Sequence, residues 1–199
     1  MSNLNSYLSL NFSIVLALVI NSILFTETIK KPTENKDQKV DIVETSYVTY
    51  QEARELGTSL IKKFEGFRSK EYICYGGKST IGYGFTRTNK TSMTKTEADQ
   101  MLINVYDRMH RSIWNKLKHD ITEPQMAALI SLGYNIGIYG LYKSTLFQKI
   151  QEGNFNNDTI SEEFKKYVYA RNQKTGQPTI LKGLEKRRNA EIELFAMCK

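Results

Sequence analysis

Cysteine and histidine are scarce in this chain, which has 199 residues and two of each. The cysteines, Cys74 and Cys198, stand far apart and do not have the spacing of metal ligands. The histidines, His110 and His119, lie in a helical stretch rich in lysine and arginine, where we expect them to be exposed. So few histidines argue against a histidine-based catalytic triad and against a zinc site.

Signatures of nucleic-acid binding are also missing, because the chain has no zinc-finger spacing, no arginine-rich tract and no RNA-binding aromatic motif. It has no internal repeat and no low-complexity tract. The formal net charge is nevertheless +7, and the pI is about 9.2. A basic surface suits nucleic acid, anionic lipid or bacterial cell wall, and charge alone does not choose among them. A nucleic-acid binder remains a rival reading, which predicts salt-dependent binding to DNA.

A long apolar run lies near the N-terminus, at residues 8–25, and only uncharged polar residues interrupt it. Its length suffices for a weak membrane span. A cleaved signal peptide is the alternative, but no basic region precedes the run and no clear cleavage site follows it. We favour an uncleaved signal-anchor over a signal peptide. Residues 1–25 then form this segment, 26–45 a polar linker, and 46–199 one folded domain.

The folded domain opens with a helix followed by a small sheet. Residues 50–64 carry apolar side chains at helical spacing and lead into Glu65. Residues 72–89 are rich in glycine, aromatic and β-branched residues, and Gly76-Gly77 is a signal for a tight turn. An acidic residue, Glu65, therefore lies at the junction between the predicted helix and the predicted hairpin.

Capping-box patterns predict two further helices, one beginning at residues 94–97 and one at 122–125. The second is apolar nearly all round, so we expect it to be buried. Residues 161–170 predict a short helix, and 171–178 a loop. Helices beside a small sheet indicate the α+β class.

A three-residue motif spans the helix and the hairpin. Eight residues separate Glu65 from Cys74, and five separate Cys74 from Thr80. With the flanking Glu65-Gly66 and Thr80-Ile81-Gly82-Tyr83-Gly84, this spacing resembles the phage-type, T4-like lysozymes and endolysins of glycoside hydrolase family 24. The resemblance covers residues 51–195. It implies a lysozyme-like fold, in which a long helix joins a small lobe with a β-hairpin or sheet to a mainly helical lobe.

The resemblance implies a muramidase that degrades peptidoglycan by cleaving the β-1,4 bond between N-acetylmuramic acid and N-acetylglucosamine. Glu65 would be the general acid, which a partly apolar cleft would help to hold protonated. Cys74 would activate water or attack the sugar directly, so inversion and retention both remain open. Thr80 would orient the water or Cys74. No metal and no organic cofactor is implied.

Further positions of the resemblance concern substrate binding. Asn135 follows the predicted buried helix and would face the sugar, although a helix C-cap is the competing reading. Arg187 and Arg188 are read as a solvated or ion-paired face rather than as substrate contacts. Phe85 is a departure, because many relatives have histidine after the Gly-Tyr-Gly.

The resemblance also bears on partners and location. We expect peptidoglycan glycan strands as the partner, no nucleic acid, membrane association through residues 8–25, and a monomer. The chain would be exported to the periplasm or cell envelope, with or without a tether to the inner membrane. Lys30 and Lys31 after the apolar run oppose this orientation, so the export mechanism stays open.

Besides the nucleic-acid binder, two alternatives to the hydrolase remain. The first is a membrane-anchored, catalytically weak cell-wall-binding protein, and the second is a lytic transglycosylase, which the cysteine and threonine of the motif disfavour. A regulatory hypothesis also follows for the hydrolase itself, because Cys74 could be oxidised or paired with Cys198 in an oxidising periplasm, which would block catalysis.

Overall fold

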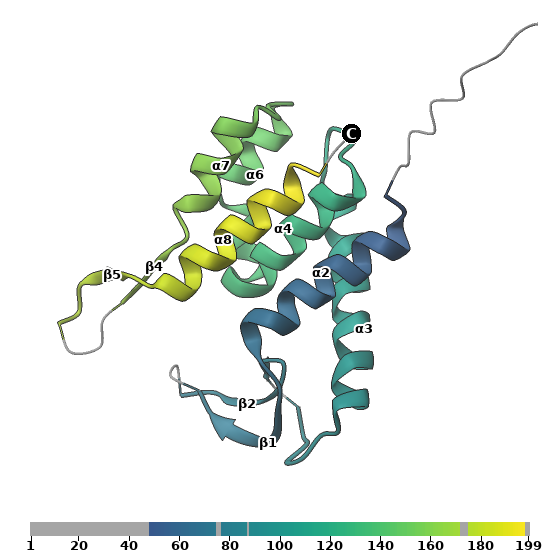
Figure 1. Cartoon of the computed structure of the whole chain (residues 1–199), viewed down its shortest axis with the longest axis vertical. Helices are drawn as coiled ribbons and strands as arrows, with labels where there is room; N and C mark the ends of the chain where they lie inside the picture. The colour runs from purple at the N-terminus through teal and green to yellow at the C-terminus, as the bar shows by residue number, and fades with distance from the viewer. Residues whose placement is uncertain (1–47, 75–76, 87, 172–174, 198–199) are drawn as a thin grey trace, which may run out of the picture. The chain divides into compact units, whose positions relative to one another are not determined.

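The computed structural model of the chain describes residues 48–74, 77–86, 88–171 and 175–197 (Figure 1). The predicted signal-anchor at 8–25 and the linker at 26–45 lie outside the described residues. Among the helices that the structure describes, none is both long and apolar enough to cross a membrane.

Helix α2 (Tyr50–Glu65) begins at a capping box that Thr49 forms with Glu52. Ala53 and Ile61, two helical turns apart, lie on its buried face. Gly66 ends the helix with φ +67°, a conformation that favours glycine. Glu65 is therefore the last helical residue, and the chain turns into the sheet immediately after it.

The sheet has three antiparallel strands, in the order β1 (Arg68–Ile73), β2 (Ser79–Gly82) and β3 (Phe85–Thr86). Tyr72 pairs with Thr80, and an irregularity follows Arg68. Strand β1 is largely exposed, whereas β2 is mostly buried. The predicted hairpin is present, with a short third strand that the sequence did not indicate.

Helix α3 (Lys95–Trp114) runs from beside the sheet to the helical part of the fold (Figure 1). Its capping box joins Thr94 and Glu97, as predicted. This is the long helix that joins the two lobes. Its buried side chains belong to one core that also takes in residues of the sheet.

Helix α4 (Glu123–Ile136) is the centre of the helical lobe, and it packs against α2, α3, α5 and α8. Every residue from Met126 to Gly133 is buried, in agreement with its apolar sequence. The other helices of this lobe are α5 (Ile138–Tyr142), α6 (Thr145–Gln151), α7 (Asn157–Lys165) and α8 (Lys182–Phe195).

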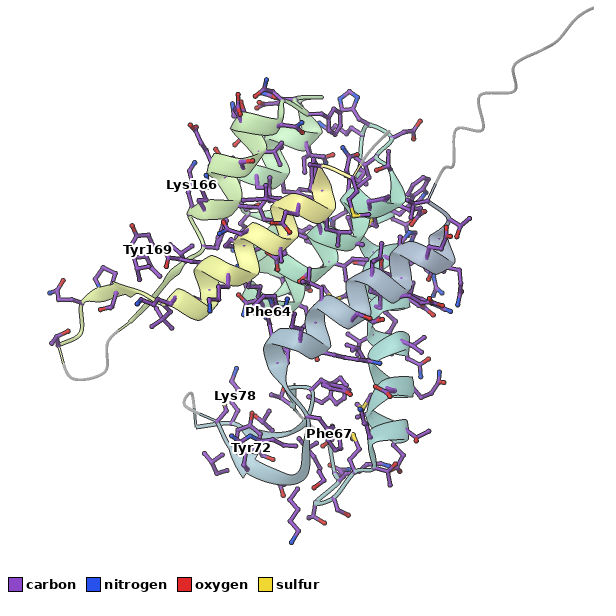
Figure 2. All side chains as sticks on the ribbon, viewed as in Figure 1. Phe64, Phe67, Tyr72, Lys78, Lys166 and Tyr169 are labelled. Carbon is purple, nitrogen blue, oxygen red and sulfur yellow. The ribbon has the colours of Figure 1, made fainter. Side chains whose placement is uncertain are left out.

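A second hairpin corrects the prediction for residues 161–178. Helix α7 begins earlier, because Asn156 caps it, and it ends at Lys165. The chain then forms β4 (Tyr169–Arg171), which pairs antiparallel with β5 (Pro178–Ile180). This hairpin projects away from the helices just before α8 (Figure 1), and Figure 2 places Tyr169 at its base.

Candidate active site

Glu65 lies where the two lobes meet, at the C-terminal end of α2. Its side chain is 23 % exposed. The backbone of Gly84 lies alongside it, because a Cβ atom on Gly84 would stand 3.3 Å from Glu65 Oε2. Gly84 has φ +91°, so glycine suits this position in both conformation and space. The turn between β2 and β3 therefore forms one wall around the carboxylate.

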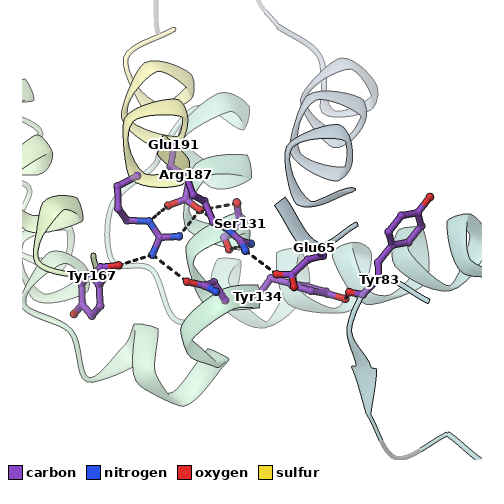
Figure 3. A network of polar contacts seen from close by, with 9 residues as sticks. Glu65, Tyr83, Ser131, Tyr134, Tyr167, Arg187 and Glu191 are labelled. Atoms are coloured by element: carbon purple, nitrogen blue, oxygen red, sulfur yellow. Dashed lines mark hydrogen bonds and ion pairs between the residues drawn. The ribbon is translucent and has the colours of Figure 1, made fainter. Parts of the chain in front are cut away.

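The other wall comes from α8. Arg187 Nη1 donates to Glu65 Oε1 at 2.6 Å, across 122 positions of sequence (Figure 3). The side chain of Arg187 is 3 % exposed, and its guanidinium carbon lies 5.8 Å from the centre of the Phe64 ring. A charge-assisted contact of this length holds the carboxyl of Glu65 in one place.

Glu191 lies behind Arg187, and its carboxylate is fully buried. Its Oε1 accepts from Arg187 Nε at 3.2 Å and from the hydroxyl of Ser131 at 2.7 Å. Arg188 Nε lies 2.7 Å from Glu191 Oε2. Burial raises the pKa of Glu191, and the charges of Arg188 and Arg187 oppose that shift. Two guanidiniums thus enclose one buried carboxylate.

This network decides between the two readings of Arg187 and Arg188. The ion-paired reading is confirmed, and the solvated one is wrong, because both side chains are buried. Burial lowers the pKa of Arg188, and the neighbouring Glu191 opposes this shift. The spacing of Arg187 and Glu191, four residues apart on a helix, was the available signal, since such residues share one face.

Tyr134 connects the helical lobe to the turn beside Glu65. Its hydroxyl donates to the carbonyl of Tyr83 at 2.7 Å (Figure 3). Burial raises the pKa of Tyr134, and the charge of Glu65 adds to this effect. Tyr83 in turn donates from its hydroxyl to Asp99, and burial followed by this bond raises the pKa of Tyr83 to about 12. The turn that flanks Glu65 is therefore held from both α4 and α3.

The structure brings Cys74 and Thr80 together at one atom, the carbonyl oxygen of Lys78. The backbone N–H of Cys74 donates to it at 2.9 Å, and the hydroxyl of Thr80 donates to it at 3.0 Å. Thr80 is 4 % exposed, and Cys74 is partly buried. Figure 2 places Lys78 and Tyr72 on this sheet. Glu65 lies instead at the other end of β2, beside Gly84.

Asn135 lies within α4 and is exposed. The C-cap residue of this helix is Gly137, so the competing reading of Asn135 as a C-cap is wrong. Its Oδ1 accepts from Arg188 Nη1 at 3.2 Å. The same cluster that holds Arg187 against Glu65 therefore also positions Asn135.

In the described part of the chain, no group of three or more His, Cys, Asp or Glu side chains is placed so that it could hold a metal ion.

Comparison with known proteins adds to this geometry. Residues 62–191 match the model of the family described as phage lysozyme. The chain belongs to the phage lysozyme family. It is a glycoside hydrolase of the lysozyme type that acts on peptidoglycan, and its α+β fold is lysozyme-like.

Three relatives illustrate the match. An endolysin of Acyrthosiphon pisum secondary endosymbiont phage 1 is 36% identical over 143 residues, which is 71% of this chain and 95% of that protein. The muramidase domain of SpmX from Asticaccaulis excentricus has a TM-score of 0.65 at 28% identity, covering 71% of this chain and 95% of the domain. An endolysin from Escherichia coli O157:H7 phage FAHEc1 has a TM-score of 0.62 at 28% identity, covering 71% and 91%.

Proposed function

We propose that this enzyme cleaves the β-1,4 bond between N-acetylmuramic acid and N-acetylglucosamine, with Glu65 as the general acid. The observation that carries the proposal is the placement of its carboxyl between Arg187 and Gly84. Oε1 accepts from Arg187, so the transferable proton belongs on Oε2, at the opposite edge of the carboxyl. Bound substrate would exclude water from the site. The proton then passes to the departing glycosidic oxygen as the bond breaks.

The pair of Cys74 and Thr80 would supply the attacking group. Thr80 uses its only hydroxyl proton on Lys78, which leaves its lone pairs able to accept a hydrogen bond from a water molecule. In one course, Cys74 as a thiolate takes the proton of that water, whose oxygen bonds to the anomeric carbon. In the other, the sulfur itself forms that bond and water later hydrolyses it. An unperturbed thiol is mostly neutral at pH 7, so either course requires a local stabilisation of the thiolate.

Asn135 would bind the sugar through its amide nitrogen. Its oxygen is engaged by Arg188, so the nitrogen is left as the outward donor of an exposed side chain. A hydroxyl or the acetamide carbonyl of the substrate would accept from it. This contact would orient the glycan without taking part in proton transfer.

The test is the release of reducing ends from Gram-negative murein sacculi by the purified full chain and by its Glu65→Gln variant. Release that the variant lacks would support the assignment, since glutamine keeps the shape but cannot donate the proton. Products with a 1,6-anhydro end would point to transglycosylation instead. Binding to sacculi without release by either protein would establish the catalytically weak wall-binding protein.

We also propose that the enzyme reaches its substrate by export to the periplasm or envelope, tethered through residues 8–25, with 46–199 as the catalytic domain. Its substrate lies outside the inner membrane, and the apolar run supports a membrane segment. Fractionation of cells that express the full chain tests this. Full-length enzyme should remain with the inner membrane and be exposed to added protease in spheroplasts. When residues 8–25 are deleted, the chain should instead leave the membrane fraction and be protected from that protease, because it is no longer exported.

A further inference from the structure

A groove lies at the opposite end of α2 from Glu65, and we call it the distal groove. It has a volume of about 430 Å³, within the range of roughly 300–1,000 Å³ that is usual for small-ligand sites. Its lining residues come from the start of α2, the second half of α3 and the start of α4: Tyr50, Asp107, His110, Arg111, Trp114 and Glu123. Tyr50 is the first residue of α2 and Glu65 the last, so roughly 22 Å of helix separates the groove from the catalytic carboxyl.

Aromatic rings form one side of the distal groove. Trp114, the single tryptophan of the chain, keeps 48 % of its surface in solvent. The imidazole of His110 stacks on it at an interplanar angle of 7°, with the ring centres 6.2 Å apart. Tyr50 meets His110 edge-on, with the ring centres 4.9 Å apart. His110 is therefore not the exposed residue that its sequence neighbours predict, but the fixed middle ring of three.

Polar groups form the remainder of the groove and are partly engaged already. Asp107 Oδ1 accepts from the hydroxyl of Tyr50 at 2.7 Å, and Glu123 Oε2 lies 3.1 Å from His110 Nε2. Burial, followed by the hydrogen bond to Asp107, raises the pKa of Tyr50 to about 12, so this hydroxyl stays protonated. Each carboxylate has about four acceptor positions, and these contacts leave several of them available.

The charges of the groove are balanced. Its two carboxylates, Asp107 and Glu123, stand beside two guanidiniums, because Arg111 lines the groove and Arg54 lies 3.5 Å from Asp107. A balanced site does not select a polyanion, since no net positive potential attracts one. An open aromatic face with acceptors and a donor at its rim instead matches a neutral ring that is apolar on its faces and carries hydroxyls at its edge.

We propose that the distal groove is a second glycan-binding site, which holds one or two N-acetylhexosamine rings of peptidoglycan with a sugar face against Trp114. The inference rests on the proposed function, because that function supplies the glycan. A strand held there, roughly 22 Å from Glu65, keeps the enzyme on the insoluble wall between cuts. Two contacts on one polymer raise the local concentration of substrate without any change at the catalytic residues.

Trp114 provides a direct measurement, since its fluorescence reports on this groove and not on the catalytic cleft. The full chain carrying Glu65→Gln is titrated with the trimer of N-acetylglucosamine. We expect a saturable change in emission that Asp107→Asn weakens severalfold. Tyr169→Ala removes an aromatic side chain that is 54 % exposed outside the groove, and it should leave the titration unchanged. The proposal would be overturned if the sugar produced no saturable change in emission. It would also be overturned if free diaminopimelate changed the emission and the sugar did not.

Kinetics separates this site from the catalytic one. In the otherwise unaltered chain, Trp114→Ala should lower kcat/KM on intact sacculi by about tenfold or more but leave the hydrolysis of short soluble murein oligosaccharides unchanged. Trp114→Phe should recover much of the activity on sacculi. An equal loss on both substrates would mean a structural role and overturn the proposal. If the chain bound the sugar at Trp114 but hydrolysed neither substrate, the proposed function would be wrong and the second glycan-binding site would still be supported.

Discussion

At the scale of single residues, Gly84 shows how closely the backbone is fitted to the carboxyl of Glu65. We expect Gly84→Ala to cost about 1–2 kcal/mol of folding free energy, because φ is positive there. It should lower kcat far more than this loss implies, since the new methyl would stand 3.3 Å from Glu65 Oε2. Gly176→Ala is the matched control, because its φ is +70° and no atom lies within 4 Å of the added Cβ. Equal kcat values for the two variants would contradict the prediction.

Glu191 is the residue on which the position of Arg187 depends. We expect Glu191→Gln to destabilise the fold by about 3–5 kcal/mol, because two buried guanidiniums lose their shared carboxylate. Urea unfolding measures the change. Glu193→Gln makes the same substitution on the exposed face of α8 and should stay within about 0.5 kcal/mol of the parent. A Glu191→Gln chain as stable as the Glu193→Gln chain would show that Glu191 is not ionised.

At the scale of elements, the start of α3 carries a pH-dependent contribution to stability. Lys90, and then the backbone of Thr94, lower the pKa of Glu97 from 4.5 to about 2. A lowered pKa contributes stability above the unfolded value, near 4.5, and that stability is lost as the pH falls toward 2. Glu97→Gln keeps the capping geometry but not the charge. Its urea midpoint should lie below that of the parent at pH 6 and converge with it near pH 2. A difference that is constant with pH would argue against the ionic contribution.

The elements themselves were predictable to different degrees. The three capping threonines, Thr49, Thr94 and Thr122, act through hydrogen bonds to residues three positions away, and two of these boxes were recognised in the sequence. The β4–β5 hairpin was missed, because its short strands carry no periodic pattern and gain their stability from pairing with each other. Local chemistry can be read directly, whereas pairing between segments requires knowledge of which segments meet.

At the scale of the whole molecule, Cys74 poses a question about compartment. That Cys74 can be oxidised or paired with Cys198 stays a prediction, since Cys198 lies outside the described residues. We expect chain recovered from an oxidising compartment to have fewer than two free thiols and low activity, both restored by reductant. If a disulfide with Cys198 causes the loss of activity, the Cys198→Ser variant should stay active in the oxidising compartment. If oxidation of Cys74 alone causes it, this variant should still lose activity there. A count of two thiols in active exported protein, unchanged by reductant, would remove the hypothesis.

The sequence by itself determined the family, the helix that ends at Glu65, and the hairpin that carries Cys74 and Thr80. Each of these depends on spacing along a short stretch, where a hairpin or a helix turn sets the geometry. Only the tertiary structure decided that Arg187 reaches Glu65, that Glu191 is buried behind it, and that Trp114, His110 and Tyr50 share one groove. These contacts join residues from different helices, and a buried ion pair has no sequence signal distinct from that of an exposed one. The packing of α8 and α2 against α4 is what brings such charges together and removes the water that would otherwise screen them.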